Sequence, residues 1–461
     1  MFNSLTPKAL PKDLLAWLRY IEQLHPNAIE MGLDRIKTVA NRLGLKPAFK
    51  IVTVAGTNGK GSTCTMLSQI YQHAGYRVGC YTSPHILRYN ERVNVDGQEV
   101  SDASLCAAFA AVEEARQGGS DNGDAISLTY FEIGTLAAVW HFVQAKVDVA
   151  ILEIGLGGRL DAVNAFEPDC TIVTNVDLDH QDILGHTREL IGFEKAGVYR
   201  PFIPAICGDI DPPETLIAYA KQVKADLKCI HHEFGYELDD ASWYYLSNQQ
   251  RMYPLPIPAL KGQYQLSNAA CAVTAINALQ SVLPVSVDAI AKAIQEIKLV
   301  GRFYTDSRFP WLILDVAHNP HAAVALADNL KTLKSSHIPV KNNAECQMQV
   351  TSVFSMLADK DIKGVIEALK DEISAWYVAP IEHVRGASVS ALVNAISEVI
   401  PNASVKVFDN LGDAYYQAYI DRESCIEQHE NDKIVAFGSF FTVSGVMQYL
   451  NEHVNTSLRK Q

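Results

Sequence analysis

The stretch Ile51–Thr63, IVTVAGTNGKGST, decides the fold that we predict for this chain. Its first four residues are apolar or β-branched, which is typical of a buried strand. A glycine-rich turn, Gly56–Gly61, follows, and a helical pattern runs from about Ser62 to His73. Glycines let backbone N–H groups converge on a phosphate at the positive end of a helix. Strand, turn and helix together therefore predict a phosphate-binding loop.

The loop departs from the usual phosphate-loop pattern at two positions. Gly61 separates Lys60 from Ser62, and Val54 stands where a glycine is usual. A glycine-rich turn without a ligand is therefore the alternative interpretation of the loop taken alone. In the nucleotide-binding interpretation, the Lys60 ammonium faces the outer phosphates, and the hydroxyl of Ser62 or Thr63 binds magnesium.

Composition limits the kinds of partner. The chain has 461 residues, enough for two to three domains, and a formal net charge of −13. Nucleic-acid binding relies on basic surface, so we expect no nucleic-acid partner. No apolar run is long enough to span a bilayer and the N-terminus lacks a signal-peptide pattern, so we expect no membrane partner and a cytoplasmic location. The nine cysteines form no CxxC pair, which predicts reduced thiols.

Polar side chains follow several of the predicted strands. In open α/β sheets the carboxyl ends of the strands bind ligands, so these positions are candidate site positions. A carboxylate that ends an apolar strand beside a phosphate loop binds magnesium in nucleotide hydrolases. Taken singly, the Ser-Pro turn and the loop histidine are more typical of a surface turn and a surface histidine. The motifs are Ser83-Pro84-His85 after Tyr76–Tyr81, Glu153 after Val147–Leu152, and Asp179-His180 after Cys170–Thr174.

Strands and helices alternate along the whole chain, which predicts an α/β fold. We expect a doubly wound sheet domain of the P-loop ATPase type over residues 1–298. The pattern restarts near Leu299–Arg302, and we expect a smaller, Rossmann-like α/β domain over residues 299–461. Two such domains facing each other predict a cleft that opens and closes around a substrate.

Six motifs follow one another along the chain: Thr53–Ser62, Ser83–His85, Leu152–Asp161, Asp179-His180, Glu194–Gly197 and Asp315–His321. In this order and spacing they resemble the folylpolyglutamate synthase/dihydrofolate synthase family of the Mur ligase superfamily. The resemblance extends from about Leu14 to Val443. It implies an ATP-dependent amide ligase, in which a pteroate or folate carboxylate is phosphorylated and the acyl phosphate is then attacked by L-glutamate.

The resemblance also implies the residues of the site. ATP would contact Thr57, Asn58, Gly59, Lys60, Gly61, Ser62, Asn268, Arg302 and Asp315. Two Mg²⁺ ions would be held by Ser83, Glu153, His180 and Lys195, the last as a carbamate. The pterin substrate would contact Ala28, Ile29, Glu30, Met31, Thr129, Tyr130, Phe131, Glu132, Leu160, Asp161 and Ala162.

The catalytic residues implied are Lys60, Lys195 and His318. His318 would contact the glutamate or the phosphate. The alternative, a histidine at a helix start that bonds the backbone next to Asn319-Pro320, has about equal weight. Composition alone would make Glu194 and Lys195 a solvated pair.

The segments Ala28-Ile29 and Thr129–Phe131 resemble those of the bacterial bifunctional enzymes, which use dihydropteroate as well as tetrahydrofolates. The small-molecule partners implied are therefore dihydropteroate, tetrahydrofolates and L-glutamate, and the family favours a monomer. Val384 and Phe441 depart from the family pattern, which bears on contacts in the C-terminal domain. The alternatives are a folylpolyglutamate synthase alone, a P-loop NTPase or phosphotransferase of another substrate class, and a nucleotide sensor without catalysis.

Overall fold

The computed structural model describes residues 10–27, 29–118, 124–336, 348–424 and 431–458. It divides the chain into two compact units. The first unit comprises Met1–Ile257 and Ser267–Glu296, and the second comprises Pro258–Leu266 and Ile297–Gln461. The division after Glu296 lies close to the expected boundary, whereas the assignment of Pro258–Leu266 to the second unit was not expected from the sequence.

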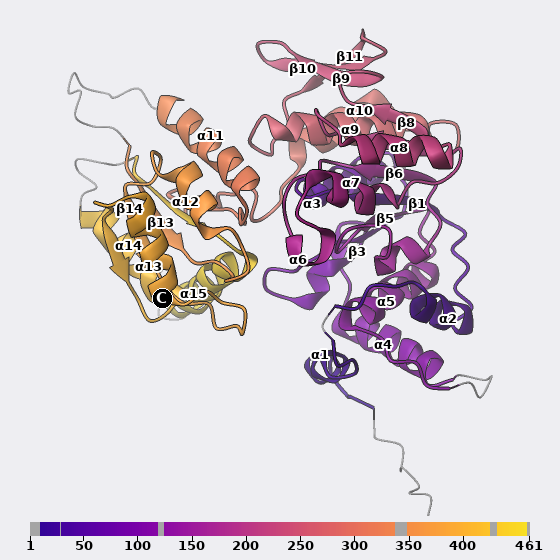
Figure 1. Ribbon diagram of the computed structural model, residues 1–461, viewed down its shortest axis with the longest axis horizontal. Coiled ribbons are helices and arrows are strands. Elements are labelled where there is room, and N and C mark those ends of the chain that lie inside the picture. The colour runs from indigo at the N-terminus through magenta and orange to yellow at the C-terminus, as the bar shows by residue number, and fades with distance from the viewer. Residues whose placement is uncertain (1–9, 28, 119–123, 337–347, 425–430, 459–461) are drawn as a thin grey trace, which may run out of the picture. The chain divides into compact units, whose positions relative to one another are not determined.

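An eight-stranded sheet forms the centre of the first unit (Figure 1). Its strand order is β4-β3-β2-β5-β1-β6-β7-β8. All neighbours from β2 to β8 are parallel, whereas β3 and β4 add an antiparallel edge beside β2. The strands are β1 (Lys50–Ala55), β2 (Val78–Tyr81), β3 (Val93–Val95), β4 (Gln98–Glu99), β5 (Val149–Glu153), β6 (Cys170–Val173), β7 (Pro204–Cys207) and β8 (Asp226–Cys229).

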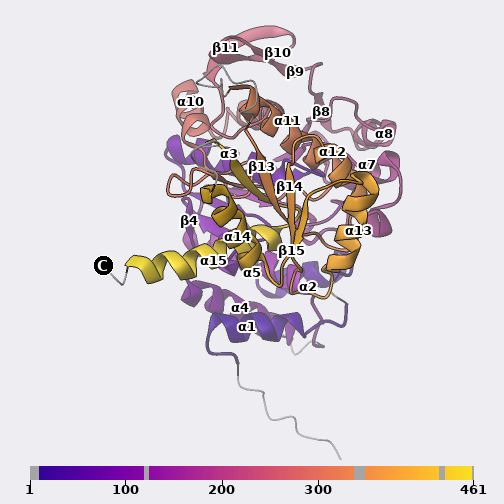
Figure 2. The ribbon, with the colours of Figure 1, turned by 90° about the vertical axis from the view of Figure 1, so that its left-hand side faces the viewer.

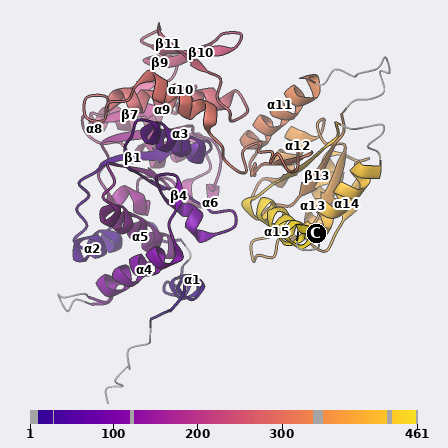
Figure 3. The same ribbon diagram turned by 180° about the vertical axis from the view of Figure 1, so that it is seen from behind.

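Helices cover both faces of this sheet because its parallel strands are apolar on both sides. In β1, Ile51 and Ala55 belong to a core cluster with buried residues of α4, α5, α7 and α8. The buried residues of α3 are absent from that cluster, and Figure 3 shows α3 beside α10 across the sheet from α4 and α5. The helices are α1 (Leu14–Glu22), α2 (Asp34–Arg42), α3 (Lys60–His73), α4 (Asp102–Arg116), α5 (Tyr130–Ala145), α6 (Gln181–Leu184), α7 (Arg188–Ala196), α8 (Glu214–Val223), α9 (Tyr264–Ala278) and α10 (Val287–Glu296), with the 3₁₀ turns η1 (Tyr89–Arg92) and η3 (Ala162–Ala165).

A small antiparallel sheet extends the first unit beyond β8. It consists of β9 (Phe234–Leu238), β10 (Ser242–Ser247) and β11 (Gln250–Pro256), in the order β11-β10-β9. The buried ring of Trp243 donates its Nε1–H to the Pro256 carbonyl at 2.9 Å. The polar stretch His231–Pro258 was expected to form edge strands. It forms a separate antiparallel sheet instead.

The second unit is built on a five-stranded parallel sheet with the order β12-β16-β13-β14-β15. Figure 2 shows α11, α12 and α13 on one side of this sheet and α14 and α15 on the other. Alternate strand residues such as Phe354 and Trp376 form a core cluster with α11, α12 and α13. The elements are β12 (Leu312–Leu314), α11 (Pro320–Ser336), β13 (Val350–Phe354), α12 (Ile362–Leu369), β14 (Ala375–Val378), α13 (Val389–Val399), β15 (Val405–Val407), α14 (Leu411–Ser424), β16 (Lys433–Phe437) and α15 (Phe440–Leu458).

The expected fold class is confirmed: the chain has a doubly wound α/β unit and a smaller, Rossmann-like parallel α/β unit. The antiparallel edge formed by β3 and β4 was not predicted. The seven cysteines within the described residues are all free, as predicted for them. None of the helices in the described ranges combines the length and the apolar character that a membrane crossing needs.

Candidate active site

Two glycines shape the loop between β1 and α3. Gly56 has φ +143°, and a Cβ there would lie 1.8 Å from the Thr174 hydroxyl oxygen. Gly59 caps α3 in the left-handed region at φ +84°, and a Cβ there would lie 2.5 Å from the side-chain oxygen of Asn268. Any larger residue would therefore clash at either position. Asn268, which the family resemblance placed at the nucleotide, lies against the phosphate loop.

The loop is held by the segment that follows β6. The Thr57 N–H donates to the Asn175 carbonyl at 3.0 Å, and the Asn58 N–H donates to the Asn175 side-chain oxygen at 2.8 Å. The Lys60 ammonium donates to the carbonyls of Gly56 and Thr57 at 3.1 Å each. The Lys60 charge therefore lies over the loop at the N-terminus of α3, where the helix dipole also favours an anion. The helix begins at Lys60, slightly before the expected start at Ser62.

Glu153 ends β5 beside this loop. It pairs in register with Val54 of β1 and is 4% exposed. Its Oε2 accepts the Ser83 N–H at 3.0 Å, so two of the expected metal ligands are neighbours. The charges of Glu153 and Lys60 both act on the Cys64 thiol of α3, in opposite directions, although burial is the main reason why its pKa is raised. Glu153, Ser83 and Lys60 therefore surround one region at the carboxyl end of the sheet.

Lys195 lies on α7 and is buried, not solvated as composition would suggest. Burial and then the charge of Lys60 lower the pKa of Lys195 to about 7, against the opposing influence of Asp179 and Asp161. Lys195, Lys60 and these two carboxylates consequently share one electrostatic environment. A lysine with this pKa is largely uncharged just above neutral pH.

His180 directly follows Asp179 and begins α6 with φ +51°. Its N–H donates to Asp179 Oδ1 at 2.8 Å. Within the described ranges no group of three or more His, Cys, Asp or Glu side chains is arranged to hold a metal ion. The expected ligand set contains only Glu153 and His180 of those four types, because the other two ligands are a serine and a modified lysine.

Asp161 is a second buried titratable group in this region. Its two oxygens accept the Leu156 N–H at 2.9 Å and the Val163 N–H at 3.0 Å. Burial raises the pKa of Asp161 to about 7 in spite of these bonds. Asp161 thereby fixes the glycine-containing loop that follows β5 to the start of η3.

The three segments expected to hold the pterin ring lie together in the first unit. Arg35 connects two of them, since its Nη1 donates to Glu30 Oε1 at 2.5 Å and its Nη2 lies 3.2 Å from Glu132 Oε1. The third segment, Leu160–Ala162, is connected to the first by the Gly32 N–H, which donates to the Leu160 carbonyl at 3.2 Å. Ala28 lies outside the described residues. Arg35 was not found by the sequence analysis, because an isolated arginine in a helix carries no motif.

The start of α5 combines helix capping with an aromatic surface. The Thr129 hydroxyl accepts the Glu132 N–H at 3.2 Å, and Glu132 Oε2 accepts the Thr129 N–H at 2.8 Å, which is a capping box. The Phe131 ring lies against Gly155, where a Cβ would come within 2.5 Å of it. The Tyr130 ring packs edge-on against Tyr89 at 5.8 Å. These contacts place Phe131 beside the loop that follows Glu153.

His85 of the Ser-Pro-His motif is tied to Arg92. The Arg92 Nε–H donates to His85 Nδ1 at 2.9 Å. Burial and then the Arg92 charge lower the pKa of His85 to about 4, so this histidine is neutral at physiological pH. The Arg92 guanidinium also lies over the rings of Tyr89 and Tyr130, at 5.4 and 5.7 Å from their centroids.

In the second unit, Asp315 is the centre of a separate cluster. Its oxygens accept the N–H groups of Phe303 and Ala317, each at 2.8 Å. Burial raises its pKa, while the charges of Arg302 and His318 oppose that shift. The structure therefore brings Arg302, Asp315 and His318 together within this unit.

The His318 ring bonds the backbone, since its Nδ1 lies 2.7 Å from the Val316 carbonyl oxygen. This is the geometry of the alternative considered from the sequence. The ring centroids of His318 and Phe440 lie 6.3 Å apart, and the Arg302 guanidinium lies 5.6 Å from the Phe440 centroid. Of the two departures from the family pattern, Val384 is almost fully exposed, and Phe441 stacks on His383 at 4.8 Å.

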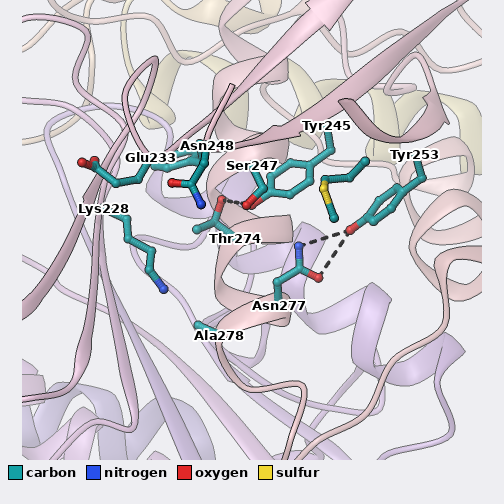
Figure 4. A pocket seen from close by; sticks show the side chains of 11 residues that line it. Lys228, Glu233, Tyr245, Ser247, Asn248, Tyr253, Thr274, Asn277 and Ala278 are labelled. Atoms are coloured by element: carbon teal, nitrogen blue, oxygen red, sulfur yellow. Dashed lines mark hydrogen bonds between the residues drawn. The ribbon is translucent and has the colours of Figure 1, made fainter. Parts of the chain in front are cut away.

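A separate cavity of about 310 Å³ lies between the small antiparallel sheet and α9 (Figure 4). The rings of Tyr245 and Tyr253 stack at 5.8 Å, and their hydroxyls bond Thr274 and Asn277. None of the expected site residues lines this cavity. The cavity is therefore not the candidate site.

Comparison with known proteins identifies two matching family domains. The Mur ligase middle domain matches residues 54–276, and the Mur ligase glutamate ligase domain matches residues 301–440. The dihydrofolate synthase/folylpolyglutamate synthase of Escherichia coli K12 is 43% identical over 447 residues, which cover 97% of each chain.

Solved structures give the same result. The structure of E. coli FolC in complex with DHPP and ADP is 42% identical, has a TM-score of 0.84 and is matched over 97% of this chain and 100% of that chain. The bifunctional folylpolyglutamate synthase/dihydrofolate synthase from Yersinia pestis, complexed with AMPPNP and Mn ion, is 43% identical with a TM-score of 0.83, over 97% of this chain and 100% of that chain. These similarities extend over nearly the whole chain.

Proposed function

This chain belongs to the dihydrofolate synthase/folylpolyglutamate synthase family of Mur-type ligases, and we propose that it uses ATP to join L-glutamate to dihydropteroate and to tetrahydrofolates. The family resemblance drawn from the six motifs is thereby confirmed, and the chain is an ATP-dependent ligase. One observation of the structure carries the assignment of roles. The phosphate-loop Lys60 lies close enough to the buried Lys195 that its charge adds to burial in lowering the pKa of Lys195 to about 7.

The first step of the proposed reaction activates a carboxylate, which is a poor electrophile. The substrate carboxylate attacks the γ-phosphorus of ATP, the bond to the β-phosphate oxygen breaks, and an acyl phosphate and ADP form. The Lys60 ammonium and the N-terminus of α3 stabilise the negative charge that spreads over the moving phosphoryl group. Thr57–Ser62 and Asn268 would hold the nucleotide in the first unit, and the family resemblance also assigns Arg302 and Asp315 to nucleotide binding.

In the second step the neutral amine of L-glutamate attacks the acyl carbon. The amide forms, inorganic phosphate leaves with the bridging oxygen, and the amine loses a proton. Water would hydrolyse the acyl phosphate, so the site must exclude water and hold the amine in an attacking position. We assign contact with the glutamate or the phosphate to His318, whose Nδ1 lies 2.7 Å from the Val316 carbonyl oxygen.

The donor groups near the phosphate loop fit a divalent cation. Glu153 supplies a buried carboxylate, Ser83 supplies a hydroxyl, and His180 supplies a ring nitrogen. Magnesium bound there supplies positive charge that offsets the charge of the phosphates. A relative from Yersinia pestis was solved with AMPPNP and a manganese ion, which supports a metal-dependent nucleotide site.

Lys195 fits a carbamate because only a neutral amine reacts with carbon dioxide. The nitrogen lone pair of the neutral amine forms a bond to the carbon of CO₂, and one proton leaves to give the anionic carbamate. The lowered pKa of Lys195, about 7, supplies the neutral amine. The product would replace the amine by an anionic oxygen ligand suited to the second of two magnesium ions.

The pterin subsite that we propose is formed by Ile29–Met31, Thr129–Glu132 and Leu160–Ala162, and the family resemblance adds Ala28. Arg35 supports this assignment because it connects Glu30 to Glu132. The aromatic face of Tyr130 and Phe131 suits a flat ring, since aromatic rings stack favourably. We further propose that the protein is a monomer that acts in the cytoplasm.

An assay of phosphate release tests the proposed function. Release from ATP should require L-glutamate together with dihydropteroate or tetrahydrofolate, and a product heavier by one glutamyl residue should appear in the mass spectrum. Activity with tetrahydrofolate alone would reduce the function to that of a folylpolyglutamate synthase. Phosphate release without either co-substrate would instead indicate an NTPase.

A further inference from the structure

Arg92 holds a guanidinium group whose hydrogen-bonding capacity is only partly used. Its Nε donates to His85 Nδ1 at 2.9 Å. In the residues that the structure describes, neither Nη1 nor Nη2 has an acceptor, although the side chain is half-buried. Half-buried guanidinium groups usually find partners for their donors, because an unpaired polar group away from water costs free energy.

The position of Arg92 connects the metal candidates with the pterin segments. Its carbonyl accepts the Thr82 N–H at 2.9 Å, next to Ser83, whose own N–H donates to Glu153. Its guanidinium lies over Tyr130 at the start of α5. An anion bound to Arg92 would therefore lie between the site of carboxylate activation and the aromatic surface proposed for the pterin ring.

Three other cations of this region are already engaged. Arg35 pairs with Glu30 and Glu132, and Arg159 pairs with Glu194 at 2.8 Å. Lys60 donates to the carbonyls of the phosphate loop. Glu91, the carboxylate next to Arg92, accepts the backbone N–H groups of the preceding turn. In a chain with a net charge of −13, Arg92 is thus a suitable local attractor for an anionic substrate.

The inference about Arg92 rests on the proposed function. The two types of substrate in that function, dihydropteroate and tetrahydrofolates, differ in their anionic groups. Dihydropteroate has a single carboxylate, which is the group that reacts. The glutamyl unit of a tetrahydrofolate has two carboxylates, and one of them stays unreacted while the other is activated. An arginine with two free terminal nitrogens matches a carboxylate bidentately.

We propose that Arg92 binds the non-reacting carboxylate of the glutamyl unit and thereby sets the preference for tetrahydrofolates over dihydropteroate. Arg92 is then a specificity-determining residue, because a substrate without that carboxylate makes no contact with its terminal nitrogens. The stacking on Tyr89 and Tyr130 and the bond to His85 hold the guanidinium in place, so little conformational entropy is lost when the carboxylate binds.

The test compares the binding of tetrahydrofolate and tetrahydropteroate, which differ only in the glutamyl unit. We expect Arg92→Gln to raise the Kd of tetrahydrofolate about 10- to 100-fold, the range for loss of a hydrogen bond between charged groups. The Kd of tetrahydropteroate should change much less than that of tetrahydrofolate, and circular dichroism checks that the variant is folded. Arg88→Gln is the matched control, because Arg88 lies on the same segment but is exposed and pairs with Asp102.

Three outcomes would overturn the inference: an equal loss of affinity for both ligands, no loss for either, or a rise confined to the KM for free L-glutamate. Binding does not depend on turnover. If the wild-type protein bound both ligands but formed no product, the proposed function would be contradicted. The binding comparison would still measure the contribution of Arg92.

Discussion

Burial and then the charge of Lys60 lower the pKa of Lys195, although the two lysines lie on helices that begin more than a hundred residues apart. Lys60 starts α3 at the phosphate loop, and Lys195 is buried near the end of α7. The relationship shows that the sheet brings the two lysines to one place. It also lowers the pKa of Lys195, which would not be expected of the solvated residue that composition suggests.

Replacing Lys195 by alanine should abolish ligation, because the variant lacks the amine that forms the carbamate. Acetate should restore part of the activity by supplying a small carboxylate in the vacated space. The measurement is product formation at increasing acetate concentration, with chloride as the ionic-strength control. Inactivity that does not respond to acetate or formate would leave the carbamate without support.

Lys195 should also make stability depend on pH. Its pKa is about 7 in the folded protein, and a free lysine has a pKa of about 10.4, so the unfolded chain binds more protons between these values. The free energy of unfolding of the wild type should therefore rise with pH relative to that of Lys195→Met, by about 1 kcal/mol per pH unit.

Urea unfolding of both proteins at several pH values between neutral and about 10, in buffers free of carbon dioxide, measures this difference. A difference in the free energy of unfolding that is independent of pH would show that the Lys195 pKa is not lowered.

Gly59→Ala should weaken ATP binding as well as the fold. A side chain in the left-handed region costs about 1–2 kcal/mol, and here the added Cβ would also push into Asn268. Gly75→Ala is the matched control, since Gly75 has φ +89° with nothing within 4 Å of an added Cβ. Both variants should unfold more easily, but only Gly59→Ala should raise the Kd for ATP in calorimetry. Equal ATP affinity in the two variants would show that Asn268 does not belong to the nucleotide site.

Lys60→Ala should lower kcat by at least about 100-fold, the effect of removing one group that stabilises transition-state charge. Lys50→Ala tests whether the loss is specific, because Lys50 lies on β1 and pairs at the surface with Asp169 at 2.8 Å. Steady-state kinetics of both variants, with circular dichroism as a check of folding, give the comparison. An active Lys60→Ala variant would show that the phosphate loop is not part of the catalytic site.

The sequence predicted the features that depend on local patterns. Apolar runs such as Ile51–Val54 are buried strands, and Gly59 ends the loop with a positive φ because only glycine adopts it without strain. The order of the strands and the antiparallel edge could not be predicted, since pairing is decided by contacts between distant segments. The stretch Pro258–Leu266 joins the second unit for the same reason, without any local signal.

The same distinction between local sequence patterns and contacts between distant segments applies to the candidate site. Glu153 could be found because it ends an apolar strand, and Lys195 because it lies in a family motif. Arg35 and Arg92 could not, because their roles come from contacts with Glu132 and Tyr130, far along the chain. The burial that lowers the Lys195 pKa likewise depends on tertiary packing.

The central claim is that ATP phosphorylates the substrate carboxylate, and the fate of an oxygen isotope tests it most directly. Dihydropteroate labelled with ¹⁸O in its carboxylate would be incubated with ATP and L-glutamate, and the released phosphate examined by mass spectrometry. The account predicts that one carboxylate oxygen appears in each phosphate as the amide forms. Phosphate without the label, carrying an oxygen from water instead, would contradict it.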